Sequence, residues 1–145
     1  DVERSRGLGD VYKRQALGRN LSFLHNPVAD NELLIKSGDK LSRYMCKHTI
    51  QRWVWNVTTI QALSNHPKVV RPEIVSFEKL FFRLETQLST PLDTHSSLFL
   101  VLVEVFPLSE VWDPIILDSI NSMSENILSY KKLTNIKKYL NSLEF

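Results

Sequence analysis

The feature that most constrains the fold is an apolar repeat in the middle of the chain. Five apolar residues recur there at steps of three and four: Ile74, Phe77, Phe81, Leu84 and Leu88. This spacing is typical of one face of an α-helix. Pro72 precedes the repeat, where the first turn of a helix tolerates proline, and Pro91 follows it. The pattern predicts an amphipathic helix that must bury one face against other elements.

Similar spacing predicts five further helices, so the chain is expected to be all-α. The six helices are expected to begin near residues 31, 47, 72, 93, 113 and 129, after an irregular segment with a short helical turn at residues 21–24. Residues 98–106 read LFLVLVEVF. Such a run is compatible with a buried helix or a buried strand. We predict a helix, because no second strand is evident to pair with it.

The predicted helices fall into three pairs, at residues 31–64, 72–106 and 114–145, which gives a period of about 40 residues. The hydrophobic spacing of Ile74/Phe77/Phe81/Leu84 and Leu133/Ile136/Leu140 resembles HEAT-like helical-hairpin solenoids and, more loosely, octotricopeptide-type RNA-binding repeats. The resemblance implies three stacked antiparallel hairpins, a fragment of an α-solenoid. A compact six-helix bundle has the same pattern and is the alternative.

The start of the chain carries a second resemblance. Residues 10–15, DVYKRQ, resemble the translated end of a sequencing adaptor. We therefore expect residues 1–15 to be a non-native or disordered tail. Residues 16–145 are expected to form a single helical domain, a fragment of a longer protein.

Most catalytic chemistries find no support in the sequence. The glycines from residue 16 onward, Gly18 and Gly38, cannot form a phosphate-binding loop. Cys46 and His48 would point in different directions on a helix, so no metal site, no cofactor and no catalytic residue are predicted. Asp93, Thr94 and Ser96 are interpreted as helix caps. A single cysteine excludes an internal disulfide framework and favours a reducing, intracellular compartment.

The expected function is therefore non-catalytic binding of a macromolecule. The chain has a formal net charge of only +2, so composition alone does not identify the partner. The candidate contact residues for single-stranded RNA or a protein partner are Arg52, Trp55, Lys131, Lys132, Lys137 and Lys138. Lysines off the apolar seam could neutralise phosphates, and Trp55 beside cations could stack on a base.

Two alternatives remain open at this point. The chain could be a protein–protein scaffold without a nucleic-acid role, or a small all-α enzyme with a site near His95 and Glu104. No membrane span and no small-molecule substrate are predicted. An organellar location follows only if the RNA-binding resemblance holds.

Overall fold

The computed structural model describes residues 20–65 and 69–143. The predicted tail, residues 1–15, and its adaptor-like segment lie outside this part. The chain divides into two compact units, Asp1–Tyr44 and Met45–Phe145, and each is described by itself. No helix in the described part is long and apolar enough to cross a membrane.

The first unit contributes two helices, α2 (Leu21–His25) and α3 (Glu32–Met45). The side chain of Asn20 caps α2 by accepting a 2.8 Å hydrogen bond from the backbone N–H of Phe23. The hydroxyl of Ser22 on α2 donates to the backbone carbonyl of Ile35 on α3 over 3.2 Å. Gly38 is buried because Ser22 lies directly against it. The predicted turn at residues 21–24 and the helix beginning near residue 31 are confirmed.

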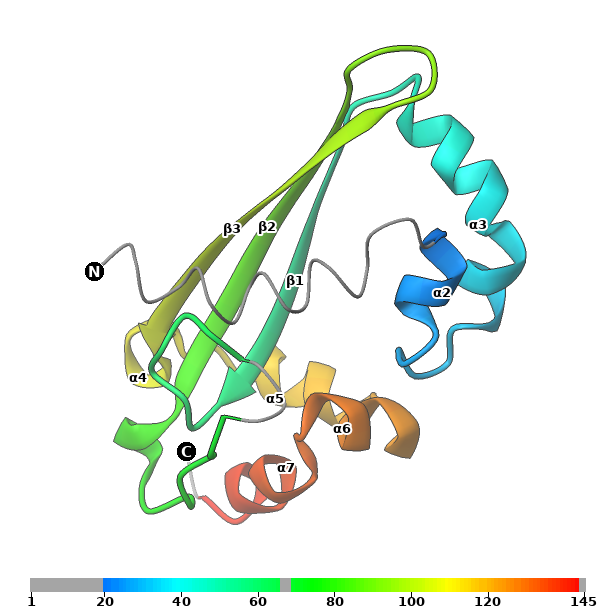
Figure 1. The fold of residues 1–145 in the computed structure, drawn as a ribbon. Coiled ribbons are helices and arrows are strands. Elements are labelled where there is room, and N and C mark those ends of the chain that lie inside the picture. Colours follow the sequence, from blue (N-terminus) through cyan, green and yellow to red (C-terminus); the bar gives the residue numbers. More distant parts are fainter. Residues whose placement is uncertain (1–19, 66–68, 144–145) are drawn as a thin grey trace. The chain divides into compact units, whose positions relative to one another are not determined.

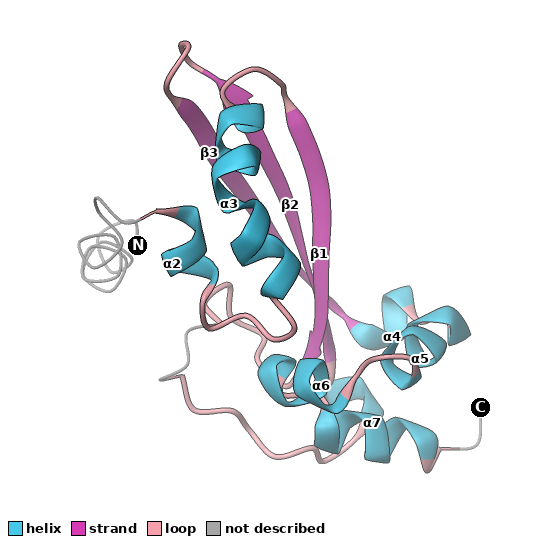
Figure 2. Cartoon of the chain, turned by 90° about the vertical axis from the view of Figure 1, so that its right-hand side faces the viewer, coloured by secondary structure: helices cyan, strands magenta, loops and turns pink. Residues whose placement is uncertain are grey.

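The second unit is built on a three-stranded antiparallel sheet in the order β1-β2-β3. Its strands are β1 (Ile50–Thr58), β2 (Phe81–Pro91) and β3 (Ser97–Pro107), which run side by side in Figures 1 and 2. The prediction of an all-α chain is therefore wrong. The helices expected from residues 47, 72 and 93 are replaced by the three strands and the short 3-10 helix η1 (Phe77–Lys79).

Part of β1 and part of β2 alternate between apolar and polar residues, as strands with two different faces do. Trp55 pairs with Leu84, and Val57 pairs with Phe82, so these four side chains lie on one face of the sheet. The intervening residues of β2 are polar and share the opposite face: Arg83, Glu85, Gln87 and Ser89. The run at residues 98–106 finds its partner in β2, with Leu102 opposite Thr86.

Four helices complete the second unit: α4 (Leu108–Val111), α5 (Pro114–Asn121), α6 (Glu125–Lys131) and α7 (Thr134–Asn141). They gather at the end of the sheet where β1 and β3 finish (Figure 1). The shared core consists of Val57, Leu80, Leu108, Ile116, Ile120, Leu128, Leu133, Ile136 and Leu140, with Trp55 and Phe82 packed against it. Sheet and helices enclose one core, so the chain is neither a helical-repeat solenoid nor a six-helix bundle.

Candidate functional site

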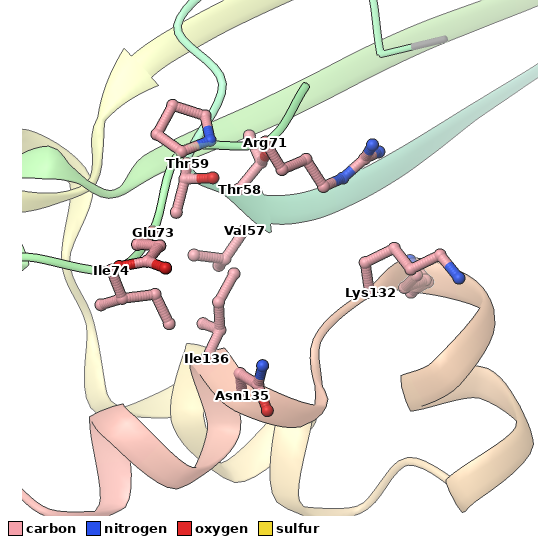
Figure 3. A pocket seen from close by; sticks show the side chains of 11 residues that line it. Val57, Thr58, Thr59, Arg71, Glu73, Ile74, Lys132, Asn135 and Ile136 are labelled. Atoms are coloured by element: carbon pink, nitrogen blue, oxygen red, sulfur yellow. The ribbon is translucent and has the colours of Figure 1, made fainter. Parts of the chain in front are cut away.

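A cleft of about 540 Å³ lies in the second unit, beside the end of β1. It is formed by three segments that are distant in the sequence: the end of β1, an extended segment around Pro72, and the corner between α6 and α7. The residues that line it are Val57, Thr58, Thr59, Arg71, Pro72, Glu73, Ile74, Lys131, Lys132, Asn135 and Ile136. Figure 3 shows most of these side chains around the cleft.

The corner between α6 and α7 depends on the backbone of Lys132. This residue is in the left-handed conformation, with φ 60° and ψ 35°, and its N–H donates to the carbonyl of Ser129 over 3.1 Å. Such a residue ends a helix and redirects the chain, a role usually taken by glycine. The Lys132 side chain lines the cleft from this corner.

The neighbouring Lys131 is hydrogen-bonded to β1, an edge strand of the sheet. Its Nζ donates a 2.6 Å hydrogen bond to the backbone carbonyl of Trp55 and lies 5.4 Å from the centre of the Trp55 ring. Asn56 Nδ2 in turn donates to the Lys131 carbonyl over 3.1 Å. Burial lowers the pKa of Lys131, and the negative charge of Glu85 partly opposes this shift.

Arg71 reaches the cleft from the extended segment. Its Nη2 donates to Asn65 Oδ1 over 2.7 Å, which fixes one side of the guanidinium and leaves its other donors for a ligand. The side chains of Glu73 and Lys132 make no hydrogen bond or ion pair with any residue in the described part. The cleft therefore combines three cationic side chains with one carboxylate, and a cation and the carboxylate are unpaired.

A chain of polar contacts runs along the polar face of the sheet. Arg83 is only 7% exposed. It donates to the Leu63 carbonyl and forms a 3.2 Å ion pair with Glu85. Gln87 also donates to Glu85, over 3.0 Å, and accepts a 2.6 Å hydrogen bond from Nε of Arg52. These contacts satisfy each group with protein partners, so we assign this chain a structural role.

The structure brings two of the six predicted contact residues into contact and separates most of the others. Trp55 and Lys131 are in contact at the edge of β1, although 76 positions separate them. Lys132 follows Lys131 in the chain and lines the cleft, which Trp55 does not. Arg52 is bonded to Gln87 on the sheet. The remaining two lie on α7, where Lys137 Nζ donates to the Asn121 carbonyl over 3.4 Å and Lys138 is exposed.

Three residues of the cleft, Arg71, Glu73 and Asn135, were not predicted from the sequence. The only local signal is the charged pair that flanks Pro72, and a pair of opposite charges on a loop is common. Packing between distant segments brings Arg71 and Glu73 to the same cleft as Lys132, whereas Asn135 follows Lys132 by three positions in the chain.

His95 and Glu104, the residues of the enzyme alternative, do not share a site in the described part of the chain. His95 lies in the turn between β2 and β3, where its backbone N–H donates to Asp93 Oδ1 over 2.7 Å. This contact, with a hydrogen bond from Ser96, lowers the pKa of Asp93. Asp93 therefore caps a turn between strands and not the expected helix. Glu104 lies in β3 opposite Leu84.

Comparison with known proteins identifies the family. The model of the family described as haem-dependent oxidative N-demethylase, alpha subunit-like, matches residues 12–141, most of the chain. The chain belongs to this family. No curated protein matches the chain. No solved structure matches it either.

Membership of the demethylase-like family overturns the functional expectations. The family takes its description from an enzyme subunit. The predicted function, non-catalytic binding of RNA or of a protein partner, is therefore wrong. The resemblance to HEAT-like and octotricopeptide-type repeats is wrong for the same reason, together with the antiparallel sheet. The enzyme alternative is the one that the family favours, although on a mixed α/β fold.

The family description names haem, and the residues that line the cleft decide whether haem fits there. Haem iron is held by histidine, cysteine, methionine or tyrosine side chains, and no residue that lines the cleft is of these types. No group of three potential metal ligands occurs in the described part of the chain. The cleft does not fit a haem iron, and no haem-based step is assigned to it.

Proposed function

We propose that the chain binds a small anionic group in the cleft, as a ligand-binding part of an oxidative N-demethylase-like enzyme. The observation that carries this proposal is the presence of Arg71, Lys131 and Lys132 around one cleft. These cations come from segments about 60 positions apart in the sequence. Family membership supplies the enzymatic context.

The two cations that can contact a ligand have complementary chemistry. The guanidinium of Arg71 is planar and can bind a carboxylate through two parallel hydrogen bonds. Lys132 adds a mobile point charge on a flexible stem. Lys131 already donates to the Trp55 carbonyl, so it contributes mainly positive potential. We therefore expect a carboxylate, or a similar small oxyanion, to bind between Arg71 and Lys132.

The other polar groups of the cleft suit the same ligand. Thr58 and Thr59 supply hydroxyl groups beside Arg71, and Asn135 supplies an amide on α7. Neutral donors of this kind orient a carboxylate without adding charge. The cleft is open to solvent, so each ion pair with the ligand should contribute only about 1 kcal/mol.

The test is calorimetric titration of the full chain with butanoate and, separately, with inorganic phosphate. Lys132→Gly is the most useful variant, because it removes a cation while relieving the left-handed backbone. Its loss of binding could not be ascribed to unfolding. Lys138→Ala is the matched control, since it removes an exposed lysine outside the cleft.

We expect Lys132→Gly and Arg71→Gln each to weaken the binding of at least one anion by about fivefold, the equivalent of about 1 kcal/mol. Lys138→Ala should leave the affinity unchanged. Binding that responds equally to all three changes would overturn the proposal, and so would the absence of binding by both anions at low salt.

A further inference from the structure

Strand β3 carries an apolar stretch that the described part of the chain leaves exposed. Its five residues are consecutive, and between 40% and 60% of each is exposed: Leu98, Phe99, Leu100, Val101 and Leu102. The rest of the strand, on both sides of this stretch, is half-buried. Neither a charged residue nor a proline interrupts the stretch, although these are the usual means by which an exposed strand avoids pairing with another chain.

The backbone of β3 also has one free side. The strand order β1-β2-β3 gives β3 a single neighbour among the described strands (Figure 1). Before β3, the N–H of Leu92 donates to the carbonyl of Ser96 over 3.0 Å, and after it the N–H of Leu108 donates to the carbonyl of Leu80 over 2.8 Å. Both pairs continue the register between β2 and β3, so the even-numbered residues of β3 bond to β2. The N–H and C=O groups of the odd-numbered residues therefore point away from the sheet.

The exposed side chains lie on both faces of the sheet. Phe99 is paired with Ser89 on the polar face, whereas Leu100 is paired with Leu88 on the opposite face. A layer stacked on the sheet would cover one of these two sets. A strand added at the edge would contact both sets and would also bond the free backbone groups. The exposure therefore favours edge pairing.

We infer that β3 pairs antiparallel with the β3 of a second copy of this chain, with the two Leu100 residues opposite each other. In this register the exposed side chains meet one another and none is left over, because Leu98 lies opposite Leu102 and Phe99 lies opposite Val101. The outward backbone groups of Phe99 and Val101 bond each other across the interface. The inference concerns a surface separate from the cleft and goes beyond the proposed function.

The single charge in β3 selects this register. Centred on Leu100, the pairing places Glu104 opposite Ser96, and the two Glu104 carboxylates of the dimer lie at opposite ends of the interface. Centred on Val101, it would place Glu104 opposite Leu98, where the carboxylate would be desolvated against an apolar side chain. Centred on Phe99, it would place Leu102 opposite Ser96 and leave apolar surface unmatched.

The other edge of the sheet is a poorer partner for β3. Strand β1 carries the charged Arg52 and the polar Asn56, and the outward carbonyl of Trp55 already accepts a hydrogen bond from Lys131. Pairing of β1 with β3 would leave a free edge on every added copy, whereas pairing of β3 with β3 closes at two copies. Since β3 has 11 residues and a standard interface has roughly 20–30 on each side, the dimer should be weak, with a Kd of about 10–100 μM.

Sedimentation velocity of the full chain, from about 1 μM to 1 mM, tests the dimer across this range of Kd. Leu100→Lys places two like charges opposite each other at the centre of the interface and should weaken the dimer by about tenfold or more. Ile115→Lys on α5 is the matched control, since Ile115 is an apolar residue 65% exposed away from β3, and it should leave the Kd unchanged. A chain that stays monomeric at the highest concentration would overturn the inference, and so would equal effects of the two substitutions.

Disulfide crosslinking tests the register without relying on Leu100→Lys. In a Cys46→Ser background, Leu100→Cys should crosslink two copies, because opposite residues of a non-hydrogen-bonded pair have Cα atoms about 4.5 Å apart. Leu98→Cys is the matched comparison on the same face, since the two substituted residues of the dimer would lie about 14 Å apart. We expect crosslinking at least about fivefold faster for Leu100→Cys. Equal rates, or a faster rate for Leu98→Cys, would contradict the pairing.

Discussion

The ammonium group of Lys131 lies over the indole ring of Trp55, 5.4 Å from its centre, and donates a 2.6 Å hydrogen bond to the carbonyl of the same residue. β1 is an edge strand, so its outward carbonyls have no neighbouring strand to bond them. Lys131 supplies a donor to one of these groups. The contact joins the helical layer to the sheet beside the cleft.

Replacing Lys131 with methionine should reduce the free energy of unfolding by about 1–2 kcal/mol. The substitution keeps a similar apolar volume but removes the cation–π contact and the hydrogen bond to the Trp55 carbonyl. Urea denaturation of the full chain measures the change. Lys138→Met, on the exposed side of α7, is the control and should change stability by less than about 0.5 kcal/mol. Equal effects of the two variants would show that the contact contributes nothing.

Stability should also depend on pH through Lys131. Its pKa is lowered in the folded protein from the ordinary value of 10.5, chiefly because burial disfavours the charged form. Between the lowered pKa and 10.5 the unfolded chain binds more protons than the folded chain, so stability contributed by this group rises with pH in that window. Urea midpoints at several alkaline pH values should show wild type gaining on Lys131→Met. A constant difference would contradict the shift.

Lys132→Gly should raise the free energy of unfolding by about 0.5–1 kcal/mol. Lys132 has a positive φ of 60°, where a side chain is strained and glycine is not. Lys132→Ala keeps the strain and should show no such gain, which makes it the control for loss of the charge. Thermal unfolding of the two variants checks the difference, and a Lys132→Gly variant less stable than Lys132→Ala would refute it.

Arg83→Met should be the most destabilising of these changes, by about 2–3 kcal/mol. It leaves the Leu63 carbonyl without its side-chain donor and Glu85 without its ion-pair partner, and unpaired groups at partly buried positions are costly. Glu85→Gln keeps hydrogen-bonding capacity and should cost about 1 kcal/mol. Urea denaturation measures both, and an Arg83→Met cost below that of Glu85→Gln would contradict the structural role of the polar contacts.

Several apolar residues of the sheet also recur at the spacing of a helix, so the sequence pattern predicts helices where the structure has strands. Phe81 and Leu84 fit a helical seam, yet on β2 they lie on opposite faces, since successive strand residues alternate. The same segment alternates between apolar and polar residues over residues 82–85 and again at Leu88 and Ser89, which is the strand signal. The start of the helix near residue 113 was predictable from a local signal, because the side chain of Asp113 caps α5 directly before Pro114. The helix predicted from residue 129 is wrong in its bounds, because the chain turns at Lys132 and two helices, α6 and α7, take its place.

Strand pairing could not be predicted in the same way. Ile50 pairs with Ser89, and that register is fixed by packing between distant segments. For the cleft, Lys132 could be predicted as solvent-facing because it lies off the apolar seam, and it is exposed. The same prediction is wrong for Lys131, whose side chain is half-buried against Trp55. Arg71 and Glu73 could not be predicted, because neither has a distinguishing local pattern and only the fold brings them to the same cleft as Lys132.

The central claim is that a carboxylate binds in this cleft, and NMR mapping tests it most directly. The full chain, labelled with ¹⁵N, is titrated with butanoate at low salt. The account predicts that the largest amide shifts occur at Thr59, Arg71, Lys132 and Asn135, and that they shrink in the Lys132→Gly variant. Shifts concentrated around Lys138 on α7 or spread over all surface lysines, unchanged by that substitution, would contradict it.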